Sequence, residues 1–510
     1  MAKVAESPQI VSPRKVSRRP AVRIQSFDSG NKKILFVTSE FADLLKVGGL
    51  GDVSAALPRA LFGHHDVRIL MPGYRQIIDS RPDIKIVGSI HRHASLPPAR
   101  LGRLDLEDGI IIYLVICPEL YDREGLAYGD EHGCDWDDNH LRFALLGHAA
   151  AEIAARRASI NWQPQLVHAN DWPAGLAPAY MRWRGLPTPS VFTIHNLVHQ
   201  GNFDASVAGQ LGIPPGAMQP DQIDHYGKLS FLKAALVYAS HITTVSETYA
   251  REITQPDSGC GLHTLLAERA SHGRLSGIRN GIDDSWHPYA DPHLLQGFTD
   301  FASQGKALHA QDVIKTFALD PRPGPIFAVV SRLVHQKGLD LTIEVAEEIV
   351  AAGGKLVIMG RGEATVEAAV VSLRDKYPDR IGVDIGFNEG GARRIFAGSD
   401  FLLMPSRFEP CGLSQLYAQR LGSLPVAHRT GGLADTIEDG VNGFLFDDVS
   451  IGAYAAAIRR AVNVYQHPDL LNAMRHRAIA SPRYWRDSVE PYDRLYRELA
   501  IDRESIVANA

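Results

Sequence analysis

Two cations that follow an apolar run could bind a diphosphate. Arg332 and Lys337 come just after residues 325–330 (PIFAVV), which have the length and composition of a buried strand, and Gly338 ends their loop. Positive charge at such a position would neutralise the negative charge that grows as a phosphate ester departs. Taken alone, the two residues are also typical of a solvated surface loop.

A glycine-rich stretch earlier in the chain offers a second anion site. Residues 46–52 (KVGGLGD) join Lys46 to the pair Gly48 and Gly49, and Asp52 closes the stretch. Glycines let backbone N–H groups approach an anion closely, and a helix starting near residue 50 would point its positive end at it. The pattern predicts a diphosphate or sugar site, with a plain strand-to-helix turn as the alternative.

A third loop, residues 406–415 (SRFEPCGLSQ), follows the apolar run 401–404 and opens a predicted helix. Glu409 stands at the mouth of this loop. A carboxylate beside an anion site is unfavourable, which indicates another task, such as binding sugar hydroxyls. A redox or nucleophilic role for Cys411 lacks a matched base or second thiol. The turn that could present free backbone N–H groups to a phosphate consists of Cys411, Gly412, Leu413 and Ser414.

Histidines and further glycines point less clearly to chemistry. His168 ends the predicted strand 165–168, a preferred ligand position, although a lone histidine is often a structural hydrogen bonder. His195 and His199 have i, i+4 spacing but lack the glutamate of the zinc motif, and residues 360–362 (GRG) lack the third glycine of a dinucleotide fingerprint. The sequence therefore predicts neither a metal site nor a nicotinamide site.

These loops need two α/β halves to position them. Short apolar runs alternate with helical patterns, which predicts parallel strands whose carboxyl ends meet at one edge of each sheet. The segment 283–323, punctuated by Pro and Asp, is predicted to be a linker. Predicted strands are residues 33–38, 67–71, 110–116, 165–168, 191–194 and 242–245, then 325–330, 355–359, 401–404 and 424–427. Predicted helices are residues 139–156, 229–240, 339–352, 413–421 and 485–500.

Composition excludes several classes of protein. The chain has 510 residues, 45% hydrophobic and 22% charged, with 53 Lys plus Arg against 58 Asp plus Glu. The net charge of −5 gives no reason to expect a nucleic-acid partner, and no apolar run approaches a membrane span. Four cysteines without a C-x-x-C pair fit a reducing compartment. The basic residues 1–31 are predicted to be a disordered tail, with a plastid or mitochondrial transit peptide as the alternative.

Taken together, these segments closely resemble the bacterial glycogen synthase and plant starch synthase family, retaining glucosyltransferases of the GT-B fold. The resemblance runs from about residue 32 to the C-terminal helix, and its strength lies in six motifs in order. The motifs are residues 46–52 (KVGGLGD), 166–172 (LVHANDW), 275–282 (LSGIRNGI), 330–339 (VSRLVHQKGL), 405–413 (PSRFEPCGL) and 429–436 (RTGGLADT).

The resemblance implies two Rossmann-like domains with parallel sheets facing across a deep cleft. Residues 32–283 would form the acceptor-side domain and 284–480 the domain for the nucleotide-sugar donor. Residues 481–510 would form a C-terminal helix that packs back on the first domain.

The resemblance also implies a role for each matching residue. Asp138 would contact the glucosyl unit or the acceptor. The expected catalytic residues are His168, Arg332, Lys337 and Glu409. The expected donor-binding residues are Lys46, Gly48, Gly49, Asp52, Asn280, Cys411, Gly412, Leu413 and Ser414.

The implied reaction is transfer of glucose from ADP-glucose, with retention, to the non-reducing end of an α-1,4-glucan such as glycogen. No metal or other cofactor is expected, and the expected location is the cytoplasm, with the plastid as the alternative. A UDP-sugar transferase or epimerase of the same fold, and a non-catalytic glucan-binding scaffold, remain open. Many related GT-B enzymes carry a second Glu eight residues after the first, where this chain has Tyr417, so ribose recognition must differ. Asn170 and Pro173 also replace residues that are often His.

Overall fold

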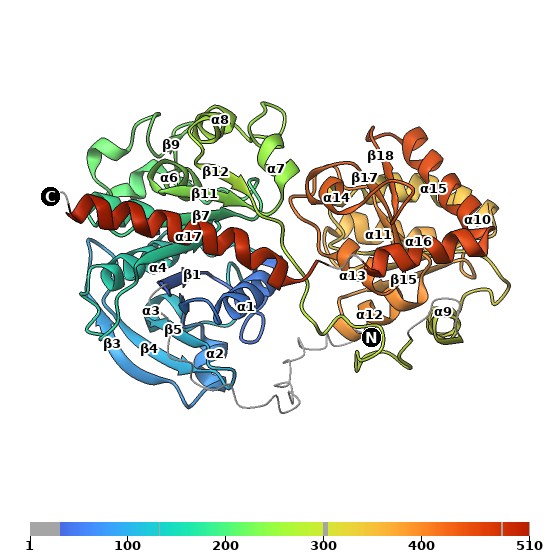
Figure 1. Ribbon diagram of the computed structural model, residues 1–510, viewed down its shortest axis with the longest axis horizontal. Coiled ribbons are helices and arrows are strands. Elements are labelled where there is room, and N and C mark those ends of the chain that lie inside the picture. Colours follow the sequence, from blue (N-terminus) through green and yellow to red (C-terminus); the bar gives the residue numbers. More distant parts are fainter. Residues whose placement is uncertain (1–30, 132, 299–303, 481–482, 509–510) are drawn as a thin grey trace, which may run out of the picture.

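The computed structural model describes residues 31–131, 133–298, 304–480 and 483–508. They form two α/β domains that lie side by side, the first in blue to green and the second in yellow to orange (Figure 1). The predicted basic tail, residues 1–31, lies outside the described residues except for its last one.

The N-terminal domain is built on a nine-stranded sheet of order β12-β11-β7-β6-β1-β2-β5-β4-β3. Its central strands are parallel and buried on both faces, which explains why they read as continuous apolar runs. Two further strands, β4 and β3, extend the sheet in antiparallel fashion. The strands are β1 (Lys33–Val37), β2 (Asp66–Pro72), β3 (Lys85–Ile90), β4 (Ala99–Asp105), β5 (Ile111–Ile116), β6 (Leu166–Asn170), β7 (Ser190–Ile194), β11 (His241–Thr244) and β12 (Leu275–Gly277).

Helices and a small second sheet complete this domain. The three-stranded sheet has the order β8-β10-β9 and lies between β7 and α6 in the chain. Its strands are β8 (Asn202–Asp204), β9 (Asp224–His225) and β10 (Lys228–Ser230). The α-helices are α1 (Gly49–Leu61), α2 (Arg75–Ser80), α3 (Pro118–Tyr121), α4 (Asn139–Ala154), α5 (Leu176–Trp183), α6 (Phe231–Tyr238), α7 (Glu247–Glu252) and α8 (His263–Ser271).

The C-terminal domain has a fully parallel six-stranded sheet of order β15-β14-β13-β16-β17-β18. Its strands are β13 (Ile326–Val330), β14 (Lys355–Gly360), β15 (Ile381–Ile385), β16 (Phe401–Met404), β17 (Leu424–His428) and β18 (Phe444–Phe446). Its helices are α10 (Leu339–Ala351), α11 (Ala364–Lys376), α12 (Glu389–Gly398), α13 (Ser414–Arg420), α14 (Gly431–Thr436), α15 (Ile451–Tyr465) and α16 (Pro468–Ala480).

The prediction that residues 283–323 are only a linker is wrong, because they contain helix α9 (Gln304–Thr316). This helix is anchored by the buried Lys306, whose ammonium donates to the carbonyl oxygens of Ser399 at 2.7 Å and Leu421 at 3.2 Å. A helix held by a lysine on backbone oxygens has a weak apolar periodicity, so the hydrophobic pattern does not reveal it.

The last helix, α17 (Trp485–Ala508), returns to the N-terminal domain and lies across it (Figure 1). Trp485, Tyr492 and Tyr496 are buried in the core of that domain. A second contact between the domains joins α7 to α14, where Thr248 donates its backbone N–H and its hydroxyl to the Asp435 carboxylate at 3.0 and 2.6 Å. Among the residues that the structure describes, no helix is both long and apolar enough to cross a bilayer.

Candidate active site

The C-terminal domain places an ion pair between a partly buried lysine and a buried glutamate at the carboxyl ends of β13 and β16. The Lys337 ammonium lies 2.5 Å from Glu409 Oε2, and the Ser406 hydroxyl donates to the same oxygen at 3.0 Å. Glu409 is 5% exposed. A buried carboxylate is tolerated only when it is paired and hydrogen-bonded, and here both conditions hold. Two residues that the sequence placed in separate loops therefore meet in one cluster.

The two loops that carry this pair are locked together by backbone contacts. Gln336 donates its side-chain amide to the Phe408 carbonyl at 3.1 Å and accepts the Arg407 N–H on its own carbonyl at 2.9 Å. Gly338 has φ 69°, and a Cβ there would lie 2.1 Å from the Pro405 carbonyl oxygen. Only glycine allows this approach, so the glycine after Lys337 fixes where the lysine stands.

Arg332 is exposed and faces the N-terminal domain. Its guanidinium donates to the Gln336 side chain at 3.4 Å, within its own loop. Burial lowers the pKa of His199 in the N-terminal domain, the positive charge of Arg332 lowers it further, and Asp135 opposes the shift. Since the charges of Arg332 and Asp135 both act on the His199 ring, Arg332 lies close to the loop that follows β7 and to the loop that precedes α4. Its exposed charge is available to a ligand.

Two buried side-chain oxygen atoms close to Cys411 and the start of α13 have no hydrogen-bond partner. Gln415 donates its amide to the carbonyls of Cys411 at 3.1 Å and Gly412 at 2.8 Å, while its own Oε1 is buried and unpaired. The Oδ1 atom of the buried Asn280 is also unpaired. Unsatisfied buried acceptors are uncommon in proteins, and both could accept a hydrogen bond from a ligand hydroxyl. Burial raises the pKa of Cys411 to about 12, so its thiol stays protonated and is a poor nucleophile.

In the N-terminal domain, part of the glycine loop is already occupied. The N–H groups of Val47 and Gly48 donate to Glu40 Oε2 at 2.7 and 2.8 Å, and the Tyr128 hydroxyl donates to Glu40 Oε1 at 2.6 Å. The expectation that Gly48 offers its N–H to an anion is therefore corrected. A Cβ built on Gly48 or Gly49 meets nothing within 4 Å, so the loop leaves open space at the start of α1.

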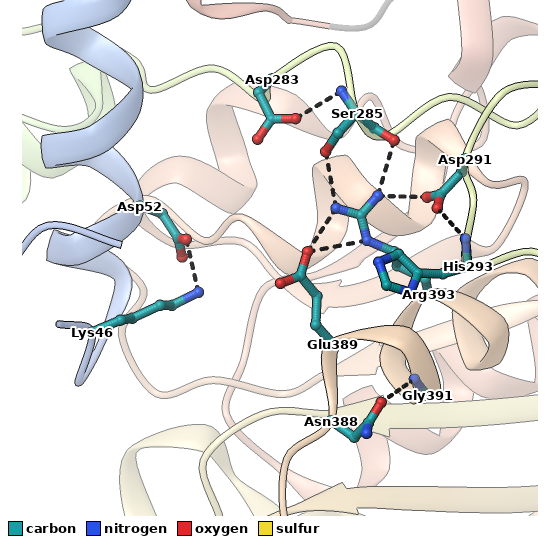
Figure 2. A network of polar contacts seen from close by, with 10 residues as sticks. All are labelled: Lys46, Asp52, Asp283, Ser285, Asp291, His293, Asn388, Glu389, Gly391 and Arg393. Atoms are coloured by element: carbon teal, nitrogen blue, oxygen red, sulfur yellow. Dashed lines mark hydrogen bonds and ion pairs between the residues drawn. The ribbon is translucent and has the colours of Figure 1, made fainter. Parts of the chain in front are cut away.

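Figure 2 shows how this loop faces the C-terminal domain. Lys46 pairs with Asp52 at 2.7 Å, and the Lys46 side chain extends toward Glu389 of the C-terminal domain. Burial raises the pKa of Asp52, the Lys46 charge opposes this, and the negative charges of Glu389 and Asp283 add to the rise. These influences place the carboxylates near one another, so opposite sides of the junction meet here.

On the C-terminal side of this junction, Arg393 and Tyr417 both pack on the ring of Trp286. Buried Arg393 pairs with Asp291 at 2.5 Å and with Glu389 at 2.8 Å, and its guanidinium carbon lies 3.8 Å from the centre of the Trp286 ring. Tyr417 also stacks on Trp286, with the two ring centres 3.7 Å apart at an interplanar angle of 11°. The tyrosine that replaces the second glutamate is thus fixed by stacking.

His168 does not reach the junction. It has no exposed surface, its Nδ1 lies 2.7 Å from the Tyr496 hydroxyl, and its Nε2 lies 2.6 Å from the Thr193 hydroxyl. Burial lowers its pKa to about 3. With both ring nitrogens engaged beneath α17, the ring has no atom left for a substrate. The expected catalytic role is therefore corrected to a structural one.

Buried neutral histidines make the stability of this domain sensitive to acid. Burial also lowers the pKa of His65, His148 and His241 to about 4. In the unfolded chain these histidines take up a proton near pH 6.5. In the folded chain the same histidines stay neutral until the pH falls to about 3 to 4. Their stabilisation is therefore complete above pH 6.5 and is lost as the pH falls.

We expect the free energy of unfolding to fall between pH 7.5 and 5.5, by about 1 kcal/mol for each such histidine. Urea unfolding at the two pH values measures this difference. A variant His272→Gln, at an exposed position, should keep the same pH dependence. A urea midpoint that does not fall at pH 5.5 would contradict the expectation.

Sequence reasoning missed two residues that stand nearer to the junction. His195 follows β7, its N–H donates to Asp171 Oδ1 at 3.0 Å, and its Nε2 lies 3.1 Å from Asn170 Oδ1. Asp171 follows β6 with φ 55°, and burial raises its pKa to about 7. Strain and a shifted pKa at the carboxyl edge of a sheet are typical of ligand sites. For Asp171 the signal was the end of the preceding strand, which the sequence prediction placed two residues too early. For His195 the strand end was predicted correctly, but the histidine was considered only as a zinc ligand.

Asp138 precedes α4 and is held by Arg123, which donates to its two carboxylate oxygens at 2.9 and 2.8 Å. Its expected contact with a glucosyl unit or acceptor stays a prediction. Within the described ranges, no three His, Cys, Asp or Glu side chains are grouped as metal ligands would be.

The architecture and the site together define a class of protein. Two parallel α/β sheets bring loops from their carboxyl edges to one junction, with a lysine–glutamate pair and an exposed arginine on one side. A glycine loop at a helix start lies on the other. This is the arrangement of a GT-B glycosyltransferase.

Comparisons with known proteins narrow the class to a family. Residues 33–268 match the family model described as "Starch synthase catalytic domain", and residues 313–480 match "Glycosyl transferases group 1". A glycogen synthase of Pseudomonas syringae pv. syringae is 59% identical over 478 residues, which cover 94% of this chain and 99% of the relative. That of Pseudomonas putida is 61% identical over 468 residues, covering 92% and 90%. The chain therefore belongs to the glycogen synthase family, and it is a retaining glucosyltransferase.

Solved structures agree with this assignment. The catalytic domain of Starch Synthase IV from Arabidopsis thaliana, bound to ADP and acarbose, superposes with a TM-score of 0.82 at 28% identity. The match covers 92% of this chain and 99% of that one. Sucrose-phosphate synthase from Thermosynechococcus elongatus, with a TM-score of 0.58 and 17% identity, shares the fold.

Proposed function

We propose that the chain transfers glucose from ADP-glucose to the non-reducing end of an α-1,4-glucan, with retention at the anomeric carbon and release of ADP. The observation that carries the proposal is the buried pair of Lys337 and Glu409 beside the exposed Arg332. Glycogen is the acceptor of choice because the close relatives are glycogen synthases. The ADP in the similar starch synthase structure favours adenine over uracil.

In this proposal Lys337 and Arg332 bind the diphosphate. As the bond between the anomeric carbon and the phosphate oxygen breaks, negative charge grows on that oxygen, and fixed cations stabilise it. The acceptor hydroxyl forms the new bond on the same face of the sugar, and its proton passes to the departing phosphate oxygen. A protonated Cys411 is no alternative nucleophile, which supports this direct route.

Glu409 holds the glucosyl unit by its hydroxyls and supports the positive charge that develops at the anomeric carbon. Its ion pair with Lys337 fixes the carboxylate in one position. Asn280 and the backbone of residues 411–414 complete the donor site, and Lys46 with Gly49 approaches the donor from the N-terminal domain. Residues 32–283 thus act as the acceptor-side domain and residues 284–480 as the donor domain.

The test is release of nucleoside diphosphate with glycogen as acceptor, comparing ADP-glucose with UDP-glucose in the presence of excess EDTA. We expect release from ADP-glucose that depends on glycogen and persists with EDTA. Release from UDP-glucose alone would overturn the donor, and loss of activity with EDTA would overturn the metal-independent mechanism. Absence of release from either donor would favour a non-catalytic scaffold.

We also infer a cytoplasmic location. All four cysteines are free thiols, which fits a reducing compartment.

A further inference from the structure

A strained hairpin turn carries an unusually exposed tyrosine. Tyr226 and Gly227 form the two-residue loop between β9 and β10, with φ 53° and 80°. Two positive φ angles are the mark of a type I′ turn, in which Asn, Asp or Gly is strongly preferred at the first position. An aromatic residue there costs about 1 kcal/mol or more. Folding alone therefore favours a different residue at position 226.

The ring of Tyr226 is supported on one side and open on the other. It is 83% exposed, the highest value among the exposed large apolar side chains of the described residues. A Cβ on Gly261 would lie 2.8 Å from ring atom Cε2, so this glycine lets the ring rest on the backbone. The His225 ring packs edge-on at 4.6 Å. The ring is thus held in a fixed orientation with a free face.

The turn is connected to the candidate site through a short chain of contacts. Gln200 donates its side-chain amide to the Cys260 carbonyl at 3.0 Å, next to the glycine that supports the ring. Gln200 directly follows His199, the residue whose ring senses the charge of Arg332. The exposed ring therefore rests on a part of the N-terminal domain that is hydrogen-bonded to the loop following β7.

We propose that Tyr226 is a stacking platform for a glucose unit of the acceptor glucan, beyond the units that enter the catalytic site. The proposal rests on the proposed function. A pyranose ring presents a face of C–H groups that packs on an aromatic ring, and a polymeric acceptor must continue across the surface after it leaves the junction. The residues beside Tyr226 on the exposed part of the hairpin are Gly227 and Lys228, so the hairpin offers one ring rather than the broad surface of a protein interface.

The decisive variant is Tyr226→Asn, because Asn suits the turn better than Tyr. We expect its Tm to rise, since the strain is relieved. We expect its KM for glycogen to rise roughly fivefold to tenfold, because no aromatic ring remains to stack on the sugar. Tyr226→Phe keeps the ring and should keep the KM of the unchanged chain. Retardation of the protein in a native gel that contains glycogen gives a second readout, independent of the donor.

An Asn variant with unchanged glycogen KM and unchanged retardation would overturn the platform. So would a variant in which kcat falls while the KM for glycogen stays the same, because that pattern indicates a role in chemistry. The proposed function fails separately, if the unchanged chain does not turn over ADP-glucose. If the Tyr226→Asn variant has a raised Tm and is no longer retarded by glycogen, while Tyr226→Phe and the unchanged chain are still retarded, the result supports the platform. This conclusion does not depend on which sugar nucleotide is the donor.

Discussion

Replacing Lys337 with alanine is expected to lower kcat by roughly 10²- to 10³-fold, the usual effect of removing one group that stabilises developing negative charge. Lys337 is largely buried, and its ammonium lies 2.5 Å from Glu409. The substitution therefore removes the charge meant for the leaving phosphate and also frees the glutamate from its fixed position. Release of ADP at saturating ADP-glucose and glycogen measures the loss.

A structural effect must be separated from the catalytic one. Lys337→Ala leaves Glu409 as a buried carboxylate without its partner, which costs stability by about 1–3 kcal/mol. The double variant Lys337→Ala with Glu409→Gln removes the unpaired charge and should regain stability without regaining activity. Lys376→Ala, at an exposed position on α11, serves as the matched lysine control. Near-normal turnover by Lys337→Ala would contradict the phosphate role.

The sequence predicted this cluster of residues because parallel strands end at a common edge. Arg332, Lys337 and Glu409 each follow a predicted strand, and the structure brings the lysine and the glutamate into contact. The same reasoning selected His168 wrongly. The predicted strand stopped at residue 168, whereas β6 continues to Asn170, so the residue at the strand tip is Asp171. Three positions along the chain separate the core residue His168 from the junction residue Asp171.

Other features could not be read from the local sequence. Glu40, which accepts the Gly48 N–H, precedes the glycine loop with no spacing that marks it as a partner. Trp286 and Tyr417 stack on each other although they are far apart in the chain, so their contact depends on tertiary packing. Periodicity reports which face of an element is buried, but it does not report which polar groups pair across elements.

Only the structure shows why the motif RTGG carries two glycines, Gly431 and Gly432. The Gly432 N–H donates to the Glu409 carbonyl at 3.0 Å, and Gly431 has φ 43°. A Cβ on Gly431 would lie 1.9 Å from the same carbonyl oxygen, and one on Gly432 would lie 2.0 Å from the Cys411 carbonyl oxygen. The start of α14 is thus packed tightly against the backbone that carries Glu409.

Gly431→Ala is accordingly expected to lower kcat by about 100-fold or more and to destabilise the chain by at least ~2 kcal/mol, because Glu409 must move away from Lys337.

The matched control is Gly440→Ala, where φ is 74° and a Cβ meets nothing within 4 Å. This control carries the strain of a positive φ, about 1 kcal/mol, without the clash. Thermal unfolding and ADP release are measured for both variants. If Gly431→Ala behaves like Gly440→Ala in both measurements, the glycine does not position Glu409. If instead only Gly431→Ala loses turnover, the backbone behind the glutamate is as much a part of the active site as the side chains in front.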